Sequence, residues 1–145
     1  MNKRVVIFLG NSERSLLPFL KSIENEFLNI VVGFGVNRVL KKSRYLDGYY
    51  NLNSTNSSSA LAICNELLSI VRKYNNPIVI PNTDDFLAII EENFDQFEAH
   101  STLTYNSKDS ISNAINKFNL IKECEKLKFN IPKYRYIANI RQAEE

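Results

Sequence analysis

Three short apolar runs, separated by segments with helical spacing, constrain the fold of this chain more than any other feature. The runs cover residues 5–9, 30–33 and 78–80, and valine and isoleucine are frequent in them. Strands that are covered on both faces of a parallel sheet have this continuous apolar composition, whereas strands with one face in water alternate polar and apolar residues. Each run is therefore predicted to be a buried strand of one parallel sheet.

The segments between these runs carry apolar residues at three- and four-residue spacing, as amphipathic helices do. The first stripe predicts a helix over residues 13–27 and consists of Leu16, Leu17, Leu20, Ile23 and Phe27. The second stripe follows the serines at 57–59, which are good N-caps, and includes Leu61, Cys64, Leu67, Leu68 and Val71. Strands that alternate with helices form an open parallel sheet through right-handed crossovers. The sequence thus predicts an α/β fold of three layers with a Rossmann-like open parallel sheet.

Length and charge narrow the classes of function. The 145 residues are 44% hydrophobic, which is enough for one well-buried core. The formal net charge of +2 provides no strong basic field, so we expect no nucleic-acid partner. No apolar run approaches the ~20 residues that span a bilayer, and the run at residues 5–9 is too short for the core of a signal peptide. We therefore expect a cytoplasmic protein with no membrane partner.

Few side chains are suited to catalysis or to metal binding. His100 is the single histidine of the chain, so no histidine-based triad and no multi-histidine metal site can form. Cys64 and Cys124 lie in helical stripes rather than in a CxxC pair, which indicates reduced thiols in or near the core. We accordingly predict no catalytic residue and no metal ligand in this chain.

Three loops follow the predicted strands, at the edge where parallel sheets bind their ligands: residues 10–12, 33–38 and 81–85. Gly10, Asn11 and Ser12 of the first loop are predicted to face a substrate. Asp84 and Asp85 of the third loop open a helix, where an N-cap aspartate accepts backbone N–H bonds and complements the helix dipole; substrate contact is the alternative. Adjacent helical residues point about 100° apart, so these two carboxyl groups cannot face each other as an acid–base pair.

The second loop contains Gly33 and Gly35, which match the first two glycines of a dinucleotide-binding fingerprint. Arg38 stands where the fingerprint needs its third small residue. A sharp turn off the strand explains these glycines better than NAD binding does.

The pattern changes after Phe94. A strand-like "TLTY" is followed by two helical segments, and the second, over residues 117–129, carries Leu120, Ile121, Cys124 and Leu127 on one face. Residues 134–137 alternate like a strand, and "RQAEE" at residues 141–145 is typical of the first turn of another helix. We expect a domain over residues 1–109, and linker helices with the beginning of a truncated second domain over residues 110–145.

Taken in order, four segments resemble the N-terminal part of an ATP-grasp enzyme, a superfamily that includes biotin carboxylase, the large chain of carbamoyl-phosphate synthetase and D-alanine ligase. The segments are "VVIFLG", "KKSRYLDGYYNL", "IVIPNTDDFLAIIEEN" and "NKFNLIKECEKLKFNIPKYRYI". Such enzymes begin with a small α/β domain called pre-ATP-grasp, and an Asp-Lys pair then opens a helix. The resemblance covers nearly the whole chain through the order and spacing of its segments. It departs from the family where Asn116 replaces the Asp of that pair, where Phe129 and Asn130 replace a glycine, and where Tyr134 replaces a second proline.

The resemblance implies an ATP-dependent ligase in which an acyl phosphate forms and an amine or another nucleophile displaces phosphate. Lys117 matches the family lysine that reaches a nucleotide phosphate; its alternative role is that of an ordinary solvated lysine. ATP and Mg²⁺ would be bound in the full-length parent, together with a small-molecule substrate, and neither would be bound by this chain alone. A homodimer is left open. The alternative function is a stand-alone Rossmann-like module that binds a nucleotide or nucleotide sugar without catalysis.

Overall fold

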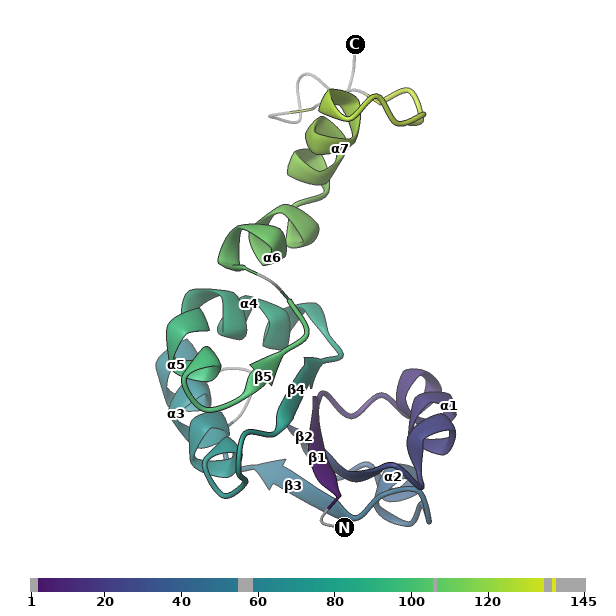
Figure 1. The fold of residues 1–145 in the computed structure, drawn as a ribbon, viewed down its shortest axis with the longest axis vertical. Helices are drawn as coiled ribbons and strands as arrows, with labels where there is room; N and C mark the ends of the chain where they lie inside the picture. The colour runs from purple at the N-terminus through teal and green to yellow at the C-terminus, as the bar shows by residue number, and fades with distance from the viewer. Residues whose placement is uncertain (1–2, 55–58, 106, 135–136, 138–145) are drawn as a thin grey trace.

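Five parallel strands form one sheet with helices on both faces (Figure 1). The computed structural model describes residues 3–54, 59–105, 107–134 and 137. The strands run in the order β3-β2-β1-β4-β5 and are β1 (Arg4–Leu9), β2 (Phe27–Phe34), β3 (Gly48–Leu52), β4 (Ile78–Pro81) and β5 (Thr102–Leu103). The three apolar runs are the three central strands, so the predicted α/β fold with an open parallel sheet is confirmed.

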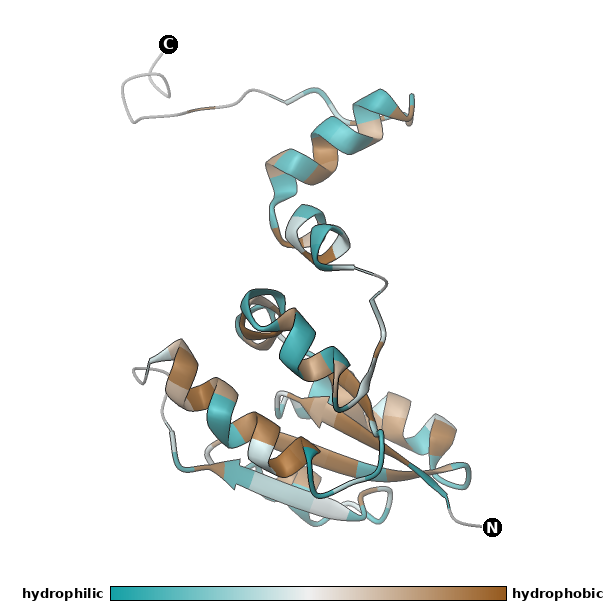
Figure 2. Cartoon of the chain, turned by 60° about the vertical axis from the view of Figure 1, so that its left-hand side comes forward, coloured by the Kyte–Doolittle hydropathy of each residue, from teal (hydrophilic) through white to brown (hydrophobic). Residues whose placement is uncertain are grey.

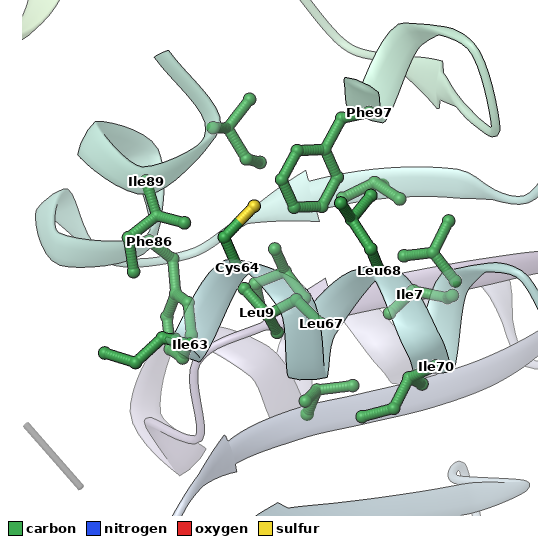
Figure 3. Close-up of a cluster of buried hydrophobic side chains, with 14 of the residues drawn as sticks. Ile7, Leu9, Ile63, Cys64, Leu67, Leu68, Ile70, Phe86, Ile89 and Phe97 are labelled. Atoms are coloured by element: carbon green, nitrogen blue, oxygen red, sulfur yellow. The ribbon is translucent and has the colours of Figure 1, made fainter. Parts of the chain in front are cut away.

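The helices are α1 (Glu13–Ile23), α2 (Arg38–Lys41), α3 (Ala60–Val71), α4 (Asp84–Glu92), α5 (Phe94–Glu98), α6 (Lys108–Ile115) and α7 (Lys117–Lys126). Alternate residues of β1 face two separate cores. Val6 and Phe8 pack with side chains of α1 and α2 on one face of the sheet. Ile7 and Leu9 pack on the other face with side chains of α3, α4 and α5 (Figure 3). Because both faces are covered, the central strands contain continuous apolar runs, as the sequence indicated.

The helix predicted over residues 13–27 is wrong at its C-terminal end. α1 ends at Ile23, and a turn follows in which the Glu26 N–H donates to the Ile23 carbonyl at 3.1 Å. Phe27 is the first residue of β2 and pairs with Arg4 of β1. Ile23 and Phe27 both pack against the same core from different elements, which is why helical spacing continued across the turn.

The sequence analysis predicted neither α2 nor α5 nor β3. Asn51 and Leu52 are the last residues of β3. β3 lies at an edge of the sheet, and Leu52 is its one fully buried residue, so it shows no continuous apolar run. In "TLTY" the strand covers Thr102 and Leu103 alone.

The two helical segments predicted after Phe94 are α6 and α7, although α7 ends at Lys126 rather than at residue 129. α6 packs against α4, and α7 packs against α6 and stands away from the sheet (Figures 1 and 2). The predicted boundary between residues 109 and 110 falls within α6 and stays a prediction. Tyr134 and Ile137 lie in no strand; residues 135–136 and the "RQAEE" segment lie outside the described residues. No helix in the described part of the chain is long and apolar enough to cross a membrane.

Candidate functional site

The strand order reverses between β1 and β4, and open α/β sheets bind ligands beyond the carboxyl ends of the strands at such a point. The loops that follow the neighbouring strands are tied to the sheet at this point. The Gly10 N–H donates to the Val32 carbonyl of β2 at 2.8 Å, and the Asn82 N–H donates to the Leu9 carbonyl of β1 at 2.7 Å. The two loops that sequence analysis predicted to face a substrate therefore begin side by side.

Gly10 is required where these loops meet. Its φ of +119° lies in a region that favours glycine. A Cβ at this position would lie 3.1 Å from the Thr83 Cγ2 and 3.4 Å from the Asn82 Cβ. The Asn82 side chain also donates to the Ser15 hydroxyl of α1 at 2.8 Å. The loop after β4 is thus held against the loop after β1 and the first turn of α1.

Asn11 connects three strands. Its side-chain nitrogen donates to the Phe34 carbonyl at the end of β2, at 2.7 Å, and to the Tyr49 hydroxyl of β3, at 3.2 Å. Ser12, the next predicted site residue, is the exposed N-cap of α1 and makes no side-chain capping bond. Asn11 therefore fixes the loop, and Ser12 leaves its hydroxyl at the surface of the strand-end region.

Asn37, which sequence analysis did not single out, completes this network. Its side-chain nitrogen donates to the Asn11 carbonyl at 2.9 Å and to the Glu13 carboxylate at 2.5 Å. Its side-chain oxygen accepts from the Val39 and Leu40 N–H groups at 3.0 and 3.1 Å, so the same residue caps α2. An asparagine directly before a helix is an N-cap signal in the sequence. Nothing in the sequence signals its contact with Asn11.

The Tyr49 hydroxyl and the Glu13 carboxylate are the remaining members of the hydrogen-bond network around Asn11 and Asn37. The Tyr49 hydroxyl accepts from the Asn37 N–H at 3.1 Å and donates to the Gly35 carbonyl at 2.9 Å, so one phenol binds both ends of the loop after β2. The pKa of Glu13 is lowered first by a hydrogen bond from the backbone N–H of Glu13 to its carboxylate, and second by the bond from the Asn37 side chain. The Glu13 carboxyl group is therefore held in its ionised form at the start of α1.

Asp84 and Asp85 lie in the first turn of α4, directly after the loop that contacts Gly10, and both are exposed. The N-cap is Thr83, so the prediction that an aspartate itself occupies the N-cap is wrong. Thr83 is the last extended residue and the helix begins at Asp84, one residue earlier than a cap at Asp84 would require. Both carboxylates remain favourable at the positive end of the helix dipole.

Lys117 is not brought together with these loops. It is the first residue of α7 and is exposed. Asn116 is the N-cap, accepting from the Phe118 and Asn119 N–H groups at 3.0 and 3.2 Å. An asparagine at this position therefore starts the helix as an aspartate would. α7 packs against α6, at a distance from the strand ends (Figure 1).

The remaining candidate groups lie apart from this site. His100 is exposed in the turn before β5. Cys64 is buried, and its burial raises the pKa of the thiol; Cys124 is half-buried, and both cysteines are free. Among the residues that the structure describes, no group of three or more His, Cys, Asp or Glu side chains is arranged to hold a metal ion.

No protein-family model and no curated protein matches this sequence. A solved structure, the biotin carboxylase domain of a single-chain bacterial carboxylase, aligns with 97% of this chain at a TM-score of 0.59 and 14% sequence identity. The fold is related to that of a biotin carboxylase domain. This chain spans about a third, 33%, of the length of that protein. The likeness agrees with the fold expected from the ATP-grasp resemblance, since biotin carboxylase is one member of that superfamily.

Proposed function

We propose that this chain is the N-terminal, substrate-side domain of a cytoplasmic ATP-dependent ligase of the ATP-grasp type, which acts through an acyl phosphate. The observation that carries the proposal is the likeness to a biotin carboxylase domain over 97% of the chain, helical extension included. The order of the sequence segments that resemble ATP-grasp enzymes supports the same superfamily independently of the fold.

The strand-end loops would bind and orient the substrate. Gly10, Asn11 and Ser12 lie beside the loop that leads to Asp84 and Asp85, at the point where the strand order reverses. The bonds made by Asn11 and Asn37 hold these loops in one arrangement before a ligand binds, which lowers the entropic cost of binding. The proposed role of this chain is thus positioning rather than catalysis.

ATP supplies the phosphoryl group in such a ligase, and Mg²⁺ neutralises charge on its phosphates. The described residues fit a metal poorly, because they include no cluster of three or more potential ligands. They fit the nucleotide at one point, the Lys117 ammonium, which is exposed at the start of α7. We therefore propose that ATP and Mg²⁺ are held mainly by a further domain of the parent protein.

Exposed apolar side chains on α7 and on the residues that follow it support the presence of such a domain. Leu120 is 46% exposed, and Leu127 and Phe129 are 68% and 63% exposed. Figure 2 shows apolar segments on α7, beyond the sheet and its covering helices. Side chains of this kind are typical of a surface that a neighbouring domain covers. Lys117 would then lie at the boundary between the two domains.

Kinetics of the intact parent protein test the assignment of Lys117. Lys117→Ala is expected to raise the KM for ATP about tenfold or more, because a charge-assisted bond contributes about 1.5–3 kcal/mol. Asp84→Ala should change the KM for ATP less, since its carboxylate lies in the proposed substrate region. Lys122→Ala is the matched control on the same helix. Unchanged ATP kinetics in the Lys117 variant would contradict the assignment.

The gene distinguishes the ligase from a stand-alone module whose strand-end loops bind a nucleotide or nucleotide sugar. Beyond the codon for Glu145, the ligase requires a further domain of about 150–200 residues. That domain should carry a glycine-rich hairpin and a late Glu-x-Asn sequence, which would provide the phosphate loop and the metal ligands. A stop codon at that point would favour the stand-alone module.

A further inference from the structure

β3 forms one edge of the sheet, with β2 as its neighbour. No described residue pairs with its outer side, so backbone N–H and C=O groups remain available along that side. Proteins commonly protect such edges with charged residues, prolines or very short strands. β3 spans five residues, Gly48–Leu52, without a charge or a proline, whereas β5 at the opposite edge spans two. The outer side of Gly48–Leu52, here called the β3 edge, is therefore a site at which an extended chain can add.

Cationic side chains flank the β3 edge on both faces of the sheet. Arg38, Lys41, Lys42 and Arg44 are exposed on α2 and on the turn that leads into β3. On the other face, the Lys73 ammonium lies over the Tyr50 ring, 4.7 Å from its centroid. Within the described parts of the chain, the one ion pair joins Glu123 to Lys126, so none of these five side chains is ion-paired.

Two carboxylates lie closest along the chain; each is held by hydrogen bonds from backbone N–H groups and forms no ion pair with these five cations. The Asp47 carboxylate accepts the Asn29 N–H at 2.7 Å. The Glu66 carboxylate accepts the N–H groups of Asn53 and Ser54 at 2.7 and 2.9 Å. The whole chain carries a net charge of only +2, so the positive charge around β3 is a local feature.

We propose that the β3 edge binds an acidic, extended segment of a partner polypeptide, which adds to the sheet as a sixth strand. Backbone bonds to β3 would hold the segment. Successive side chains of the added strand would point to opposite faces of the sheet, so one alternate set of carboxylates would meet the cations beside α2 and the other set would meet Lys73. The face that carries α2 has four cations and the other face has Lys73, so acidic residues directed toward α2 should contribute more. A second copy of this chain would present the same positive charge and be repelled. A phosphate backbone would leave the edge bonds of β3 unused.

A synthetic peptide tests the charge requirement on the full chain. The probe is a hexapeptide of alternating valine and glutamate with an acetylated N-terminus and an amidated C-terminus. It is titrated into the ¹⁵N-labelled protein, and binding is observed by nuclear magnetic resonance. Chemical shifts should change in Gly48–Leu52 and the flanking cations. Lys41→Glu combined with Lys42→Glu should weaken binding at least tenfold. The control, Lys21→Glu with Lys108→Glu, reverses two charges elsewhere and should change binding less than twofold. Equal weakening in both variants, or equal binding of a valine–lysine peptide, would overturn the proposal.

Two N-methylated versions of the peptide test strand addition separately from charge. One version carries methyl groups on the odd-numbered amides and the other on the even-numbered amides, so each removes the donors of one side of the strand. Strand addition predicts that one version loses at least tenfold in affinity and the other retains binding. Retention by both would mean general ionic attraction and would overturn the proposal. Equally tight binding of a single-stranded oligonucleotide at these residues, or dimerisation of the chain through β3, would also overturn it.

Discussion

The sheet region, residues 4–105, and the helical extension, residues 107–134, both contain amphipathic helices but differ in what covers the apolar sides. Six residues of α3 are buried, among them Leu67 and Leu68, whereas α7 has no buried residue. Ile111 is the one buried residue of α6 and belongs to the core of the sheet region. Helical spacing thus indicates that a helix has an apolar side; it does not indicate which partner covers that side.

Hydrogen bonding differs between the two regions in the same way. Bonds in the sheet region join distant loops, as between Asn11 and Phe34 or Asn82 and Ser15. Beyond α6 the contacts are local, such as the bond from the Tyr134 hydroxyl to the Glu125 carboxylate at 3.0 Å. Hydrogen bonds over long sequence separations therefore fix the loops of the sheet region, whereas α7 and the residues after it are held by local contacts.

Truncation of one phenylalanine in each region should give the largest difference in the free energy of unfolding between the two regions. Phe97 is fully buried in the sheet region, so Phe97→Ala should lower the free energy of unfolding by about 3–5 kcal/mol. Phe129 is 63% exposed in the extension, so Phe129→Ala should change it by less than about 0.5 kcal/mol. Urea unfolding followed by circular dichroism measures both. Similar losses would mean that the extension has a core of its own.

Two glycines test the loop network of the sheet region. A Cβ on Gly33 would lie 2.7 Å from the Asn11 Cβ, so Gly33→Ala must displace Asn11 and should cost about 1–3 kcal/mol. Gly35 has a φ of +70° and nothing within 4 Å of its added Cβ, so Gly35→Ala should cost roughly 1 kcal/mol through the backbone alone. Unfolding by urea and the resonances of Asn11 are the measurements. A larger loss in the Gly35 variant, with unmoved Asn11 resonances, would contradict the network.

The smallest expected effect concerns the loop after β3. Burial raises the pKa of Glu66, but bonds from Asn53 and Ser54 outweigh it and hold the pKa below the ordinary value of 4.5. Because folding lowers this pKa, Glu66 contributes stability that is fully present above about pH 4.5 and is lost as the pH falls through the lowered pKa. Glu66→Gln should therefore lose less stability than the wild type on acidification.

The control for this prediction is Glu98→Gln on α5, which removes a carboxylate that is not bonded to this loop and should retain the acid dependence of the wild type. Unfolding free energies at pH 7 and at successive lower pH values give the comparison. Identical acid dependence of the wild type and the Glu66 variant would show that the bonds from Asn53 and Ser54 do not depend on the charge of the Glu66 carboxylate.

The central part of the fold could be predicted because burial on both faces leaves a direct trace in the sequence. Ile7 and Phe8 face different cores, so β1 is apolar from Val5 to Leu9. β3 shows no continuous apolar run because an edge strand is partly exposed. α2 has four residues, which is too few for a repeated helical spacing of apolar residues to be visible in the sequence. The boundary error at Phe27 arose because a strand residue continued the stripe of the preceding helix.

The candidate site was predictable in part for a similar reason. Carboxyl ends of parallel strands meet at one edge, which is why Gly10 and the loop before Asp84 could be assigned to the same place. The contact of Asn37 with Asn11 depends on strand register across 26 residues, and no local pattern encodes it. The role of Lys117 depends on a family resemblance and stays a prediction.

Nucleotide affinity of the chain itself measures whether ATP is held mainly outside these residues. A single lysine–phosphate bond cannot offset the roughly 4 kcal/mol or more that immobilising a ligand costs. Isothermal titration calorimetry of residues 1–145 with Mg·ATP should therefore show a Kd no tighter than about 1 mM, without hydrolysis. Magnesium-dependent binding in the micromolar range would contradict the ligase-domain account and favour a stand-alone nucleotide-binding module.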